Sequence, residues 1–446
     1  MRPLHFYDFL LCAWQRDETH VQVMVQASPA GRMRAPLAVR CAYKKFDQSC
    51  ALFQEPEWYS DVKKPAALER YGNALAKVIL PEPVLALLHS SLKQIPKEDG
   101  LRLRLCLDER LMDWPWEYLR LEGLGEKTDY LALHSRISLV REAAVWTAGF
   151  EQSTAVERAV FAGTFWEDRG DYWSVQLEYI QLQQALIGVQ RFLSVEFMRS
   201  DQIALSLRQP ASIFYYSGHS ETTNQQPRVM TQGSHDADKI KWLLADDLAQ
   251  MLRKCQTRVS FLGACNSGDW AIARIFLEAG IPVHIGAQGL ITNWATWNFG
   301  SKLMASLVVG LSLDEAVMAA RWNVAENEYA KGVLNPEWGN FMVYMATSDA
   351  VIFPRPDTND VQSAQLAVRV LKVLERRFDE TELKAMCFDL SAAQSVFTHL
   401  NYQDLSGNTR IEKARELILF SQRHNGMDAL IAYVKTQRPD ETFSPD

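Results

Sequence analysis

Residues 212–220 read S-I-F-Y-Y-S-G-H-S, an apolar run that ends in a glycine and a histidine. Residues 259–268 read V-S-F-L-G-A-C-N-S-G, in which a cysteine follows a second apolar run. Short apolar runs bounded by turn residues are typical of buried strands. Both runs therefore place a side chain with catalytic chemistry where a buried strand ends.

Similar runs recur from about residue 158 onward, separated by helical patterns. The predicted strands are 159–164, 194–198, 212–216, 259–263, 283–286 and 341–345, and the predicted helices are 173–186, 245–254, 270–279 and a long stretch from 294 to about 330. This alternation favours an α/β fold, with a mostly parallel sheet flanked by helices. Active sites of such sheets collect at the carboxyl ends of the strands.

The first 150 residues mix strand and helix patterns and predict an α+β accessory segment. Strands are expected at 21–25, at 101–106 and at 137–141, the last leading outward, and a helix at 84–92 after Pro81 and Pro83. The aromatic segment M-D-W-P-W-E-Y-L at 112–119 is interpreted as packing between this segment and the α/β core.

The sequence pattern changes in the C-terminal part of the chain, where no strand pattern is present. Residues 353–364 read F-P-R-P-D-T-N-D-V-Q-S-A, whose prolines and polar residues predict a linker. Residues 365–446 carry only helical patterns, about five in number, which predict a small helical bundle. The predicted division is 1–150, 151–352, 353–364 and 365–446.

Composition places the chain among soluble, folded proteins of several domains. It has 446 residues, 48% of them hydrophobic and 23% charged, and a net charge of −7. No Lys/Arg cluster supports binding to nucleic acid or an anionic membrane, and no apolar run approaches the ~20 residues of a membrane span. The apolar stretch at 9–14 lacks the flanks of a signal peptide. We therefore expect a cytoplasmic protein with no nucleic-acid and no membrane partner.

Cysteine usage argues against a disulfide framework and against a zinc site. The seven cysteines include no C-x-x-C pair, and six of them are interpreted as small core residues. The seven cysteines are Cys12, Cys41, Cys50, Cys106, Cys255, Cys265 and Cys387, and all but Cys265 are assigned to the core. Neither G-x-G-x-x-G nor G-x-x-x-x-G-K-S/T occurs, which disfavours a nucleotide-binding protein. No metal and no organic cofactor is expected.

Cys265, the one cysteine not assigned to the core, forms a candidate catalytic pair with His219. Cys265 precedes a predicted helix, and a helix N-terminus together with a nearby imidazolium favours the thiolate, which is the nucleophile. His219 would take the thiol proton and later protonate the leaving amine. The backbone N–H groups of Gly218, Ser220 and Cys265 are candidate donors to an oxyanion.

Several further polar residues have a weaker claim to function. His235 in a polar loop and His284 in an apolar strand pattern are rivals for the role of base. The polar segment 221–239 is interpreted as a flexible lid or a processing site. Three aspartates could line a pocket for a basic side chain, although solvated loop carboxylates are the simpler interpretation. These are Asp168, Asp171 and Asp269.

The chain resembles the CHAT proteases, which are bacterial caspase-like and separase-related cysteine peptidases. The resemblance rests on Y-Y-S-G-H-S at 215–220, L-G-A-C-N-S-G at 262–268 and L-D-E-A-V-M-A-A-R at 313–321. The 46-residue step from His219 to Cys265 is also close to the ~50 residues typical of caspases. The resemblance implies a caspase-like core with these two residues as the catalytic dyad.

The resemblance extends upstream and includes one departure. D-W-P-W-E-Y-L at 113–119 and I-S-L-V-R at 137–141 look like the accessory segment that often precedes the CHAT core. Ser220 stands where many relatives have glycine, at the position whose N–H commonly serves the oxyanion hole.

Residues 378–390 and 410–420 are similar to effector-associated, death-like domains, which bind like domains on partner proteins. Together the resemblances imply a cysteine endopeptidase in bacterial antiviral defence or programmed cell death, regulated through its C-terminal domain. The implied substrate is a protein, with a gasdermin-like pore-former as one class. Two alternatives stay open: a C-terminal cap that only stabilises the protease, and a non-catalytic caspase-like scaffold in which Ser220 marks lost activity.

Overall fold

The computed structural model of the chain divides into two compact units. The first comprises Met1–Leu182 and Val195–Phe353, and the second comprises Gln183–Ser194 and Pro354–Asp446. The residues that the structure describes are 4–52, 65–124, 128–142, 158–164, 172–186, 194–199, 202–223, 225–233, 236, 239–326, 334–346, 352–353, 358–405 and 409–441.

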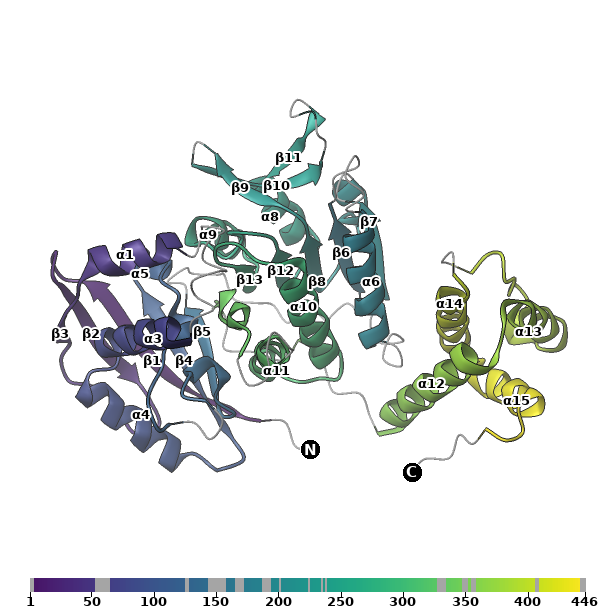
Figure 1. Cartoon of the computed structure of the whole chain (residues 1–446), viewed down its shortest axis with the longest axis horizontal. Coiled ribbons are helices and arrows are strands. Elements are labelled where there is room, and N and C mark those ends of the chain that lie inside the picture. The colour runs from purple at the N-terminus through teal and green to yellow at the C-terminus, as the bar shows by residue number, and fades with distance from the viewer. Residues whose placement is uncertain are drawn as a thin grey trace. The chain divides into compact units, whose positions relative to one another are not determined.

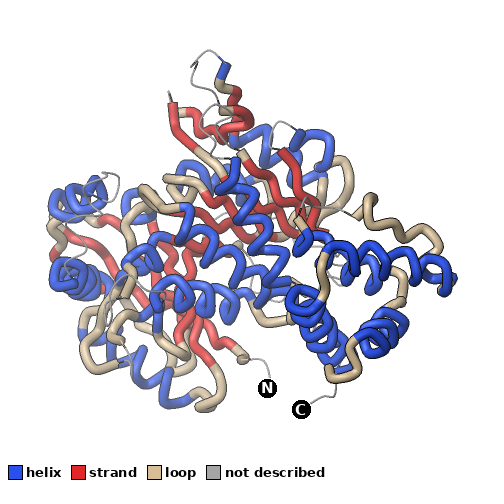
Figure 2. The backbone as a smooth tube through the Cα atoms, turned by 45° about the vertical axis from the view of Figure 1, so that its right-hand side comes forward, coloured by secondary structure: helices blue, strands red, loops and turns tan. Residues whose placement is uncertain are grey.

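Eleven described strands form one mixed sheet in the order β3-β2-β1-β4-β5-β14-β13-β12-β8-β6-β7 (Figures 1 and 2). The strands are β1 (Phe6–Gln15), β2 (His20–Ala27), β3 (Leu37–Arg40), β4 (Gly100–Leu107), β5 (Ile137–Glu142), β6 (Arg158–Gly163), β7 (Ser194–Arg199), β8 (Ile213–Ser217), β12 (Val259–Gly263), β13 (Val283–Ala287) and β14 (Phe341–Met345). The ladders that join β1, β4, β5 and β14 are parallel, and so are those that join β13, β12, β8 and β6. The β1–β2, β2–β3 and β13–β14 ladders are antiparallel. The predicted α/β fold with a mostly parallel sheet is confirmed.

Alternate residues of the central strands pack against helices on opposite faces of the sheet. One face, with Phe214, Tyr216 and Leu262, packs on α7 (Ile203–Ser206), α8 (Ala245–Lys254) and α9 (Trp270–Glu278). The other face carries stacked aromatic rings and meets α6 (Tyr172–Leu186) and α10 (Asn293–Val308). Because helices cover both faces, successive residues are all buried, and the central strands have continuous apolar sequences.

The N-terminal region continues the same sheet. Strand β5 lies between β4 and β14, so the expectation that it leads outward is wrong. The helices of this region are α1 (Tyr43–Leu52), α3 (Pro65–Ile79), α4 (Glu82–Gln94) and α5 (Glu109–Met112), with short 3-10 turns at Trp116–Tyr118 and Leu131–Leu133. The accessory segment and the core thus share backbone hydrogen bonds as well as side-chain contacts.

The aromatic segment packs as predicted. The ring of Tyr118 lies 5.1 Å from that of Trp338, and its hydroxyl donates to Asn340 Oδ1 at 2.7 Å. Next to Tyr118 in the chain, the buried carboxylate of Glu117 pairs with Arg141 at 2.5 Å and lies 3.8 Å from Arg321. All three charged side chains are fully buried, which links the segment to β5 and to α11 (Leu313–Glu326).

Two predicted boundaries are wrong. The helical stretch expected from 294 to about 330 is two helices, because α10 ends before Gly310, whose φ of +78° favours glycine. Ser312 and Glu315 then cap the start of α11 through reciprocal bonds between side chain and backbone. Helix α12 (Thr358–Arg377) begins inside the segment expected to be a linker.

The segment predicted to be a lid is a small antiparallel sheet within the described residues. Strands β9 (Ser220–Thr223), β10 (Gln226–Gln232) and β11 (Lys241–Leu244) pair in the order β11-β10-β9 (Figure 1). Because β9 starts at Ser220, this sheet begins one residue after His219. The described part of 221–239 is therefore not an irregular loop, since it contributes to the paired strands β9 and β10, and its role as a lid or a processing site stays a prediction.

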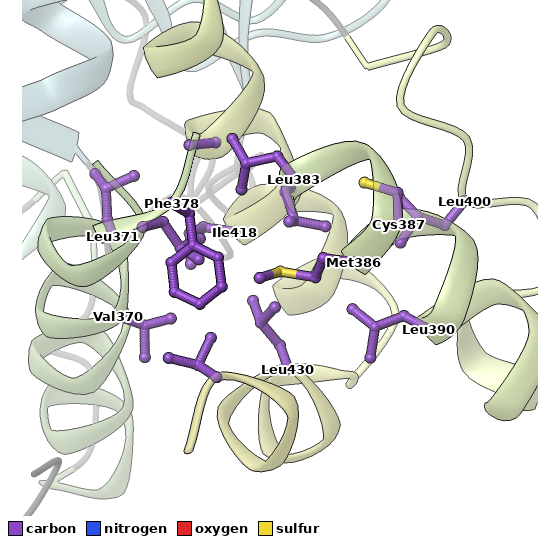
Figure 3. Close-up of a cluster of buried hydrophobic side chains, with 14 of the residues drawn as sticks. Val370, Leu371, Phe378, Leu383, Met386, Cys387, Leu390, Leu400, Ile418 and Leu430 are labelled. Carbon is purple, nitrogen blue, oxygen red and sulfur yellow. The ribbon is translucent and has the colours of Figure 1, made fainter. Parts of the chain in front are cut away.

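The C-terminal unit is built from α12, α13 (Glu380–Ala393), α14 (Arg410–Arg423) and α15 (Met427–Gln437) around a buried apolar cluster (Figure 3). Capping boxes at Asp379 and Thr409 begin α13 and α14. About five helices were expected here, and within the described residues one segment between α13 and α14, Ser395–Phe397, forms only a 3-10 turn. No single described helix has the length and apolarity of a membrane span, although the bent pair Ala66–Ile79 and Glu82–Gln94 passes that test together.

Candidate active site

His219 and Cys265 lie beyond the ends of two neighbouring parallel strands. In the ladder of β8 and β12, Ser217 stands opposite Gly263. His219 and Cys265 each follow two positions after these partners. The structure therefore brings both residues to the same carboxyl edge of the sheet, where ligands of open α/β sheets bind.

Ser220 joins the two loops that carry this pair. Its hydroxyl donates to the carbonyl oxygen of Cys265 at 2.5 Å. A second link is the N–H of Gly218, which donates to the carbonyl of Gly263 at 3.3 Å. The N–H of Gly218 already has this acceptor, so the N–H groups of Ser220 and Cys265 are the stronger oxyanion candidates. The serine side chain, whose role the sequence did not reveal, thus holds the two loops at a fixed spacing.

The backbone of His219 is held from two sides. The hydroxyl of Tyr216 lies 2.9 Å from the carbonyl oxygen of His219 and 2.8 Å from that of Met230. The N–H of Met230, on β10, donates to the same His219 carbonyl at 2.9 Å. A Cβ at Gly218 would lie 2.5 Å from the Tyr216 hydroxyl, which explains the glycine before the histidine.

The Cys265 loop folds back over the end of β13. Its backbone donates from Asn266 to Gly289 at 2.9 Å and from Gly268 to Ala287 at 2.8 Å. The Ser267 hydroxyl lies 2.6 Å from the carbonyl of Leu262. Asn266 has a φ of +60°, an uncommon conformation that asparagine tolerates better than most residues. These bonds give the loop one defined path.

His284 supports this loop and does not reach the sheet edge. Its ring is fully buried, with one nitrogen 3.0 Å from the Ser260 hydroxyl and the other 2.9 Å from the carbonyl oxygen of Ser267. Burial lowers the pKa of His284 to about 4, so the ring is neutral at physiological pH. A neutral ring held between two polar groups of the core has a structural role, which removes His284 as a rival base.

The surroundings of Cys265 disfavour its thiolate form. Burial raises the pKa of the Cys265 thiol above its ordinary value, and the Glu337 carboxylate adds to the rise, while backbone hydrogen bonds at Ile291 and at Cys265 itself oppose it. Its Sγ lies 3.9 Å from the carbonyl oxygen of Ile291. Burial thus opposes the thiolate that a helix N-terminus and an imidazolium would favour.

Of the three aspartates proposed for a substrate pocket, only Asp269 belongs to the described residues; Asp168 and Asp171, like His235, lie outside them. Asp269 is only partly exposed. Burial, and then the neighbouring Asp113 carboxylate, raises the pKa of Asp269 to about 8, with Arg141 opposing. Asp113 comes from the accessory segment and accepts a hydrogen bond from the N–H of Trp270 at 2.6 Å. The structure thus pairs Asp269 with a second buried carboxyl.

Glu178 is a buried acid behind the His219 loop that sequence reasoning missed. Its carboxylate accepts hydrogen bonds from the hydroxyls of Tyr215 and Ser217, both at 2.5 Å. Burial raises the pKa of Glu178 to about 7. Nothing in the sequence of α6 distinguishes this residue, because its partners are 37 and 39 positions away.

In the part of the chain that the structure describes, no group of three or more histidine, cysteine, aspartate or glutamate side chains could hold a metal ion.

Comparison with known proteins gives two matches to family models. The model of the CHAT domain matches residues 69–366, and the model of effector-associated domain 7 matches residues 370–439. No curated protein matches the chain. Among solved structures, two of the Saccharomyces cerevisiae separase–securin complex, at 2.6 and 3.0 Å, match with 15% and 13% identity and TM-scores of 0.32 and 0.31. Each match covers 66% of this chain and 19% of the other, so the chain spans about a fifth of their length.

Proposed function

Because the chain belongs to the CHAT domain family, the caspase-like family that its motifs resemble, we propose that it is a cysteine endopeptidase with Cys265 as nucleophile and His219 as base. The observation that carries this proposal is the junction of the two loops. Their strands are neighbours in one register, and the Ser220 hydroxyl spans the gap to the Cys265 carbonyl.

The chemistry follows from these positions. The imidazole of His219 takes the proton from Cys265 Sγ as the sulfur attacks the carbonyl carbon of the scissile peptide bond. The N–H groups of Cys265 and Ser220 stabilise the negative oxygen of the tetrahedral intermediate. The C–N bond breaks, the amine leaves with the proton from His219, and water then hydrolyses the thioester. Because the pKa of the Cys265 thiol is raised, proton transfer accompanies attack in this scheme.

We also propose that the chain cleaves next to a basic residue, with Asp269 as the acidic group that recognises it. The support is electrostatic. The Asp269 carboxyl sits beside that of Asp113, and burial raises the pKa values of both groups above the ordinary range, so a cationic side chain nearby would favour their ionised forms. Asp269 lies only four residues after Cys265, on the same loop.

The test of the proposed function is labelling with two peptide probes that carry the same thiol-reactive group and differ only in an arginine or a leucine at the residue before it. We expect Cys265 to react at least ~100-fold faster than the other cysteines, as positioned general-base catalysis allows. Labelling at this rate should vanish in Cys265→Ala. Preference for the arginine probe should be lost in Asp269→Asn, while its leucine labelling stays unchanged.

Two results would contradict this scheme separately. Labelling of Cys265 no faster than that of the remaining cysteines would refute the nucleophile and support the alternative of a non-catalytic scaffold. Fast labelling with equal rates for both probes would keep the nucleophile and refute the role of Asp269.

The second unit supports a role in protein–protein interaction, because residues 370–439 match effector-associated domain 7. We propose that it recruits or activates the peptidase through a matching domain on a partner, in bacterial antiviral defence or programmed cell death, with a gasdermin-like pore-former as one substrate class. The surface that favours such contact includes Phe388 on α13, which is 74% exposed. An exposed aromatic ring of this size is typical of an interface anchor.

Phe388→Asp is therefore expected to weaken association of the C-terminal unit with a like domain, because a charge would replace the apolar anchor. A second copy of the full chain is the probe, and sedimentation velocity over a concentration series measures the association. We expect at least a tenfold weaker association for Phe388→Asp and near-normal association for Phe388→Leu, which keeps an apolar side chain. Equal association of all three proteins would contradict a contact through Phe388.

A further inference from the structure

Cys12 and Cys106 stand directly opposite each other in the sheet. They are partners in the parallel ladder of β1 and β4, although many residues separate them along the chain. Side chains of paired residues in a ladder point to the same face of the sheet. The two thiols are close enough for a hydrogen bond between them.

The spacing suits a covalent bond between the two sulfurs. Neighbouring strands lie about 4.7–4.9 Å apart, and disulfides join Cα atoms about 4.4–6.8 Å apart. Cys12 and Cys106 are both free thiols in this structure. The other described cysteines lie on separate elements, outside this ladder: Cys41, Cys255, Cys265 and Cys387.

The two thiols differ in access and in acidity. Cys12 is 5% exposed, whereas Cys106 is only partly buried. The hydrogen bond from Cys12 lowers the pKa of the Cys106 thiol, with help from Arg104, while burial and Glu142 oppose it. The same hydrogen bond, followed by burial, raises the pKa of Cys12. A partly exposed thiol of lowered pKa beside a second thiol is the arrangement of an oxidation-sensitive pair.

We propose that Cys12 and Cys106 are an oxidation site that closes a reversible disulfide between β1 and β4, with a hydroperoxide as the oxidant. The sulfur of Cys106 attacks the terminal oxygen of the peroxide, the O–O bond breaks, and a sulfenic acid forms on Cys106 as water or an alcohol leaves. The sulfur of Cys12 then attacks the Cys106 sulfur and displaces its hydroxyl group as water. Two thiols lose two electrons to the peroxide, and a dithiol reductant restores them.

The pair is separate from the proposed peptidase site. It lies at the strands β1 and β4, which are separated from β12 by β5, β14 and β13 in the order of the sheet. The inference therefore holds whether or not Cys265 is a nucleophile, and Cys265→Ala serves as the background in which to test it.

The experiment treats full-length Cys265→Ala with hydrogen peroxide, alkylates the remaining thiols under denaturing conditions and determines the mass of the chain. We expect two fewer alkylated cysteines after oxidation, a cross-linked peptide that contains Cys12 and Cys106, and full recovery with dithiothreitol. Adding Cys12→Ser should leave Cys106 as a sulfenic acid that a dimedone reagent captures. Adding Cys106→Ser should remove both the cross-link and this capture.

Serine has nearly the size of cysteine, and circular dichroism of each variant before oxidation verifies that it is folded. Alkylation of both cysteines to the same extent before and after peroxide would overturn the proposal. Cross-links from Cys106 to any other cysteine, in place of Cys12, would overturn it as well. Dimedone capture at Cys12 in the Cys106→Ser variant would reverse the assigned roles and refute the order of the two steps.

Discussion

Glu117→Gln should lower the free energy of unfolding of the first unit by about 3–5 kcal/mol, because it removes the charge that two buried guanidinium groups share. Arg141 also donates to the carbonyl of Trp114 at 2.9 Å, and Arg321 donates to that of Phe341 at 2.9 Å. These carbonyls cannot replace a carboxylate as counter-charge. Burial lowers the pKa of Arg321 to about 10, which still leaves it charged at neutral pH.

The measurement is denaturant unfolding followed by tryptophan fluorescence. All 13 tryptophans lie before residue 354, so this signal reports on the first unit alone. Glu122→Gln is the matched control. Glu122 also pairs with an arginine, Arg120, but its side chain is 77% exposed, so we expect a change within about 0.5 kcal/mol. Equal unfolding midpoints for the two variants would show that the buried network contributes no more than a surface pair.

His219→Ala should lower kcat/KM for a cleaved peptide by a factor of about 100 to 10,000, the usual contribution of a positioned general base. The raised pKa of the Cys265 thiol makes this loss large, because little thiolate exists before the base acts. The residual rate of the variant should keep rising with pH beyond the ordinary thiol pKa, because hydroxide must then remove the proton.

The control is His20→Ala, which removes an imidazole that is 40% exposed and paired with Asp17 far from β8 and β12. It should leave kcat/KM unchanged. Wild-type kcat/KM and an unaltered pH profile in His219→Ala would mean that another group deprotonates Cys265. That result would refute the proposed dyad.

The parts of the fold that could be predicted are those that depend on local pattern. The strands before His219 and Cys265 are continuous apolar runs because helices cover both faces of the sheet, and their ends mark the candidate site. Strands β9, β10 and β11 were missed because they are partly exposed and carry polar residues such as Glu221 and Arg228, which give no apolar run.

The parts that could not be predicted depend on partners distant in sequence. In the sequence, Glu178 is one polar residue of a predicted helix. Only the fold brings its carboxylate within hydrogen-bond distance of two hydroxyls of β8. The pairing of Cys12 with Cys106 requires the register of β1 and β4, which no local pattern fixes. The raised pKa of the Cys265 thiol likewise depends on burial, which no local pattern reveals.

The shared sheet decides how the chain can be shortened. The CHAT match starts at residue 69, after β1, β2 and β3. A fragment cut there would uncover the full length of β4, whose residues are nearly all buried on both faces. A buried strand that is left with an open edge can pair with strands of other molecules. A recombinant fragment should therefore include the whole of the first unit. A fragment cut at the limits of the family match is expected to aggregate.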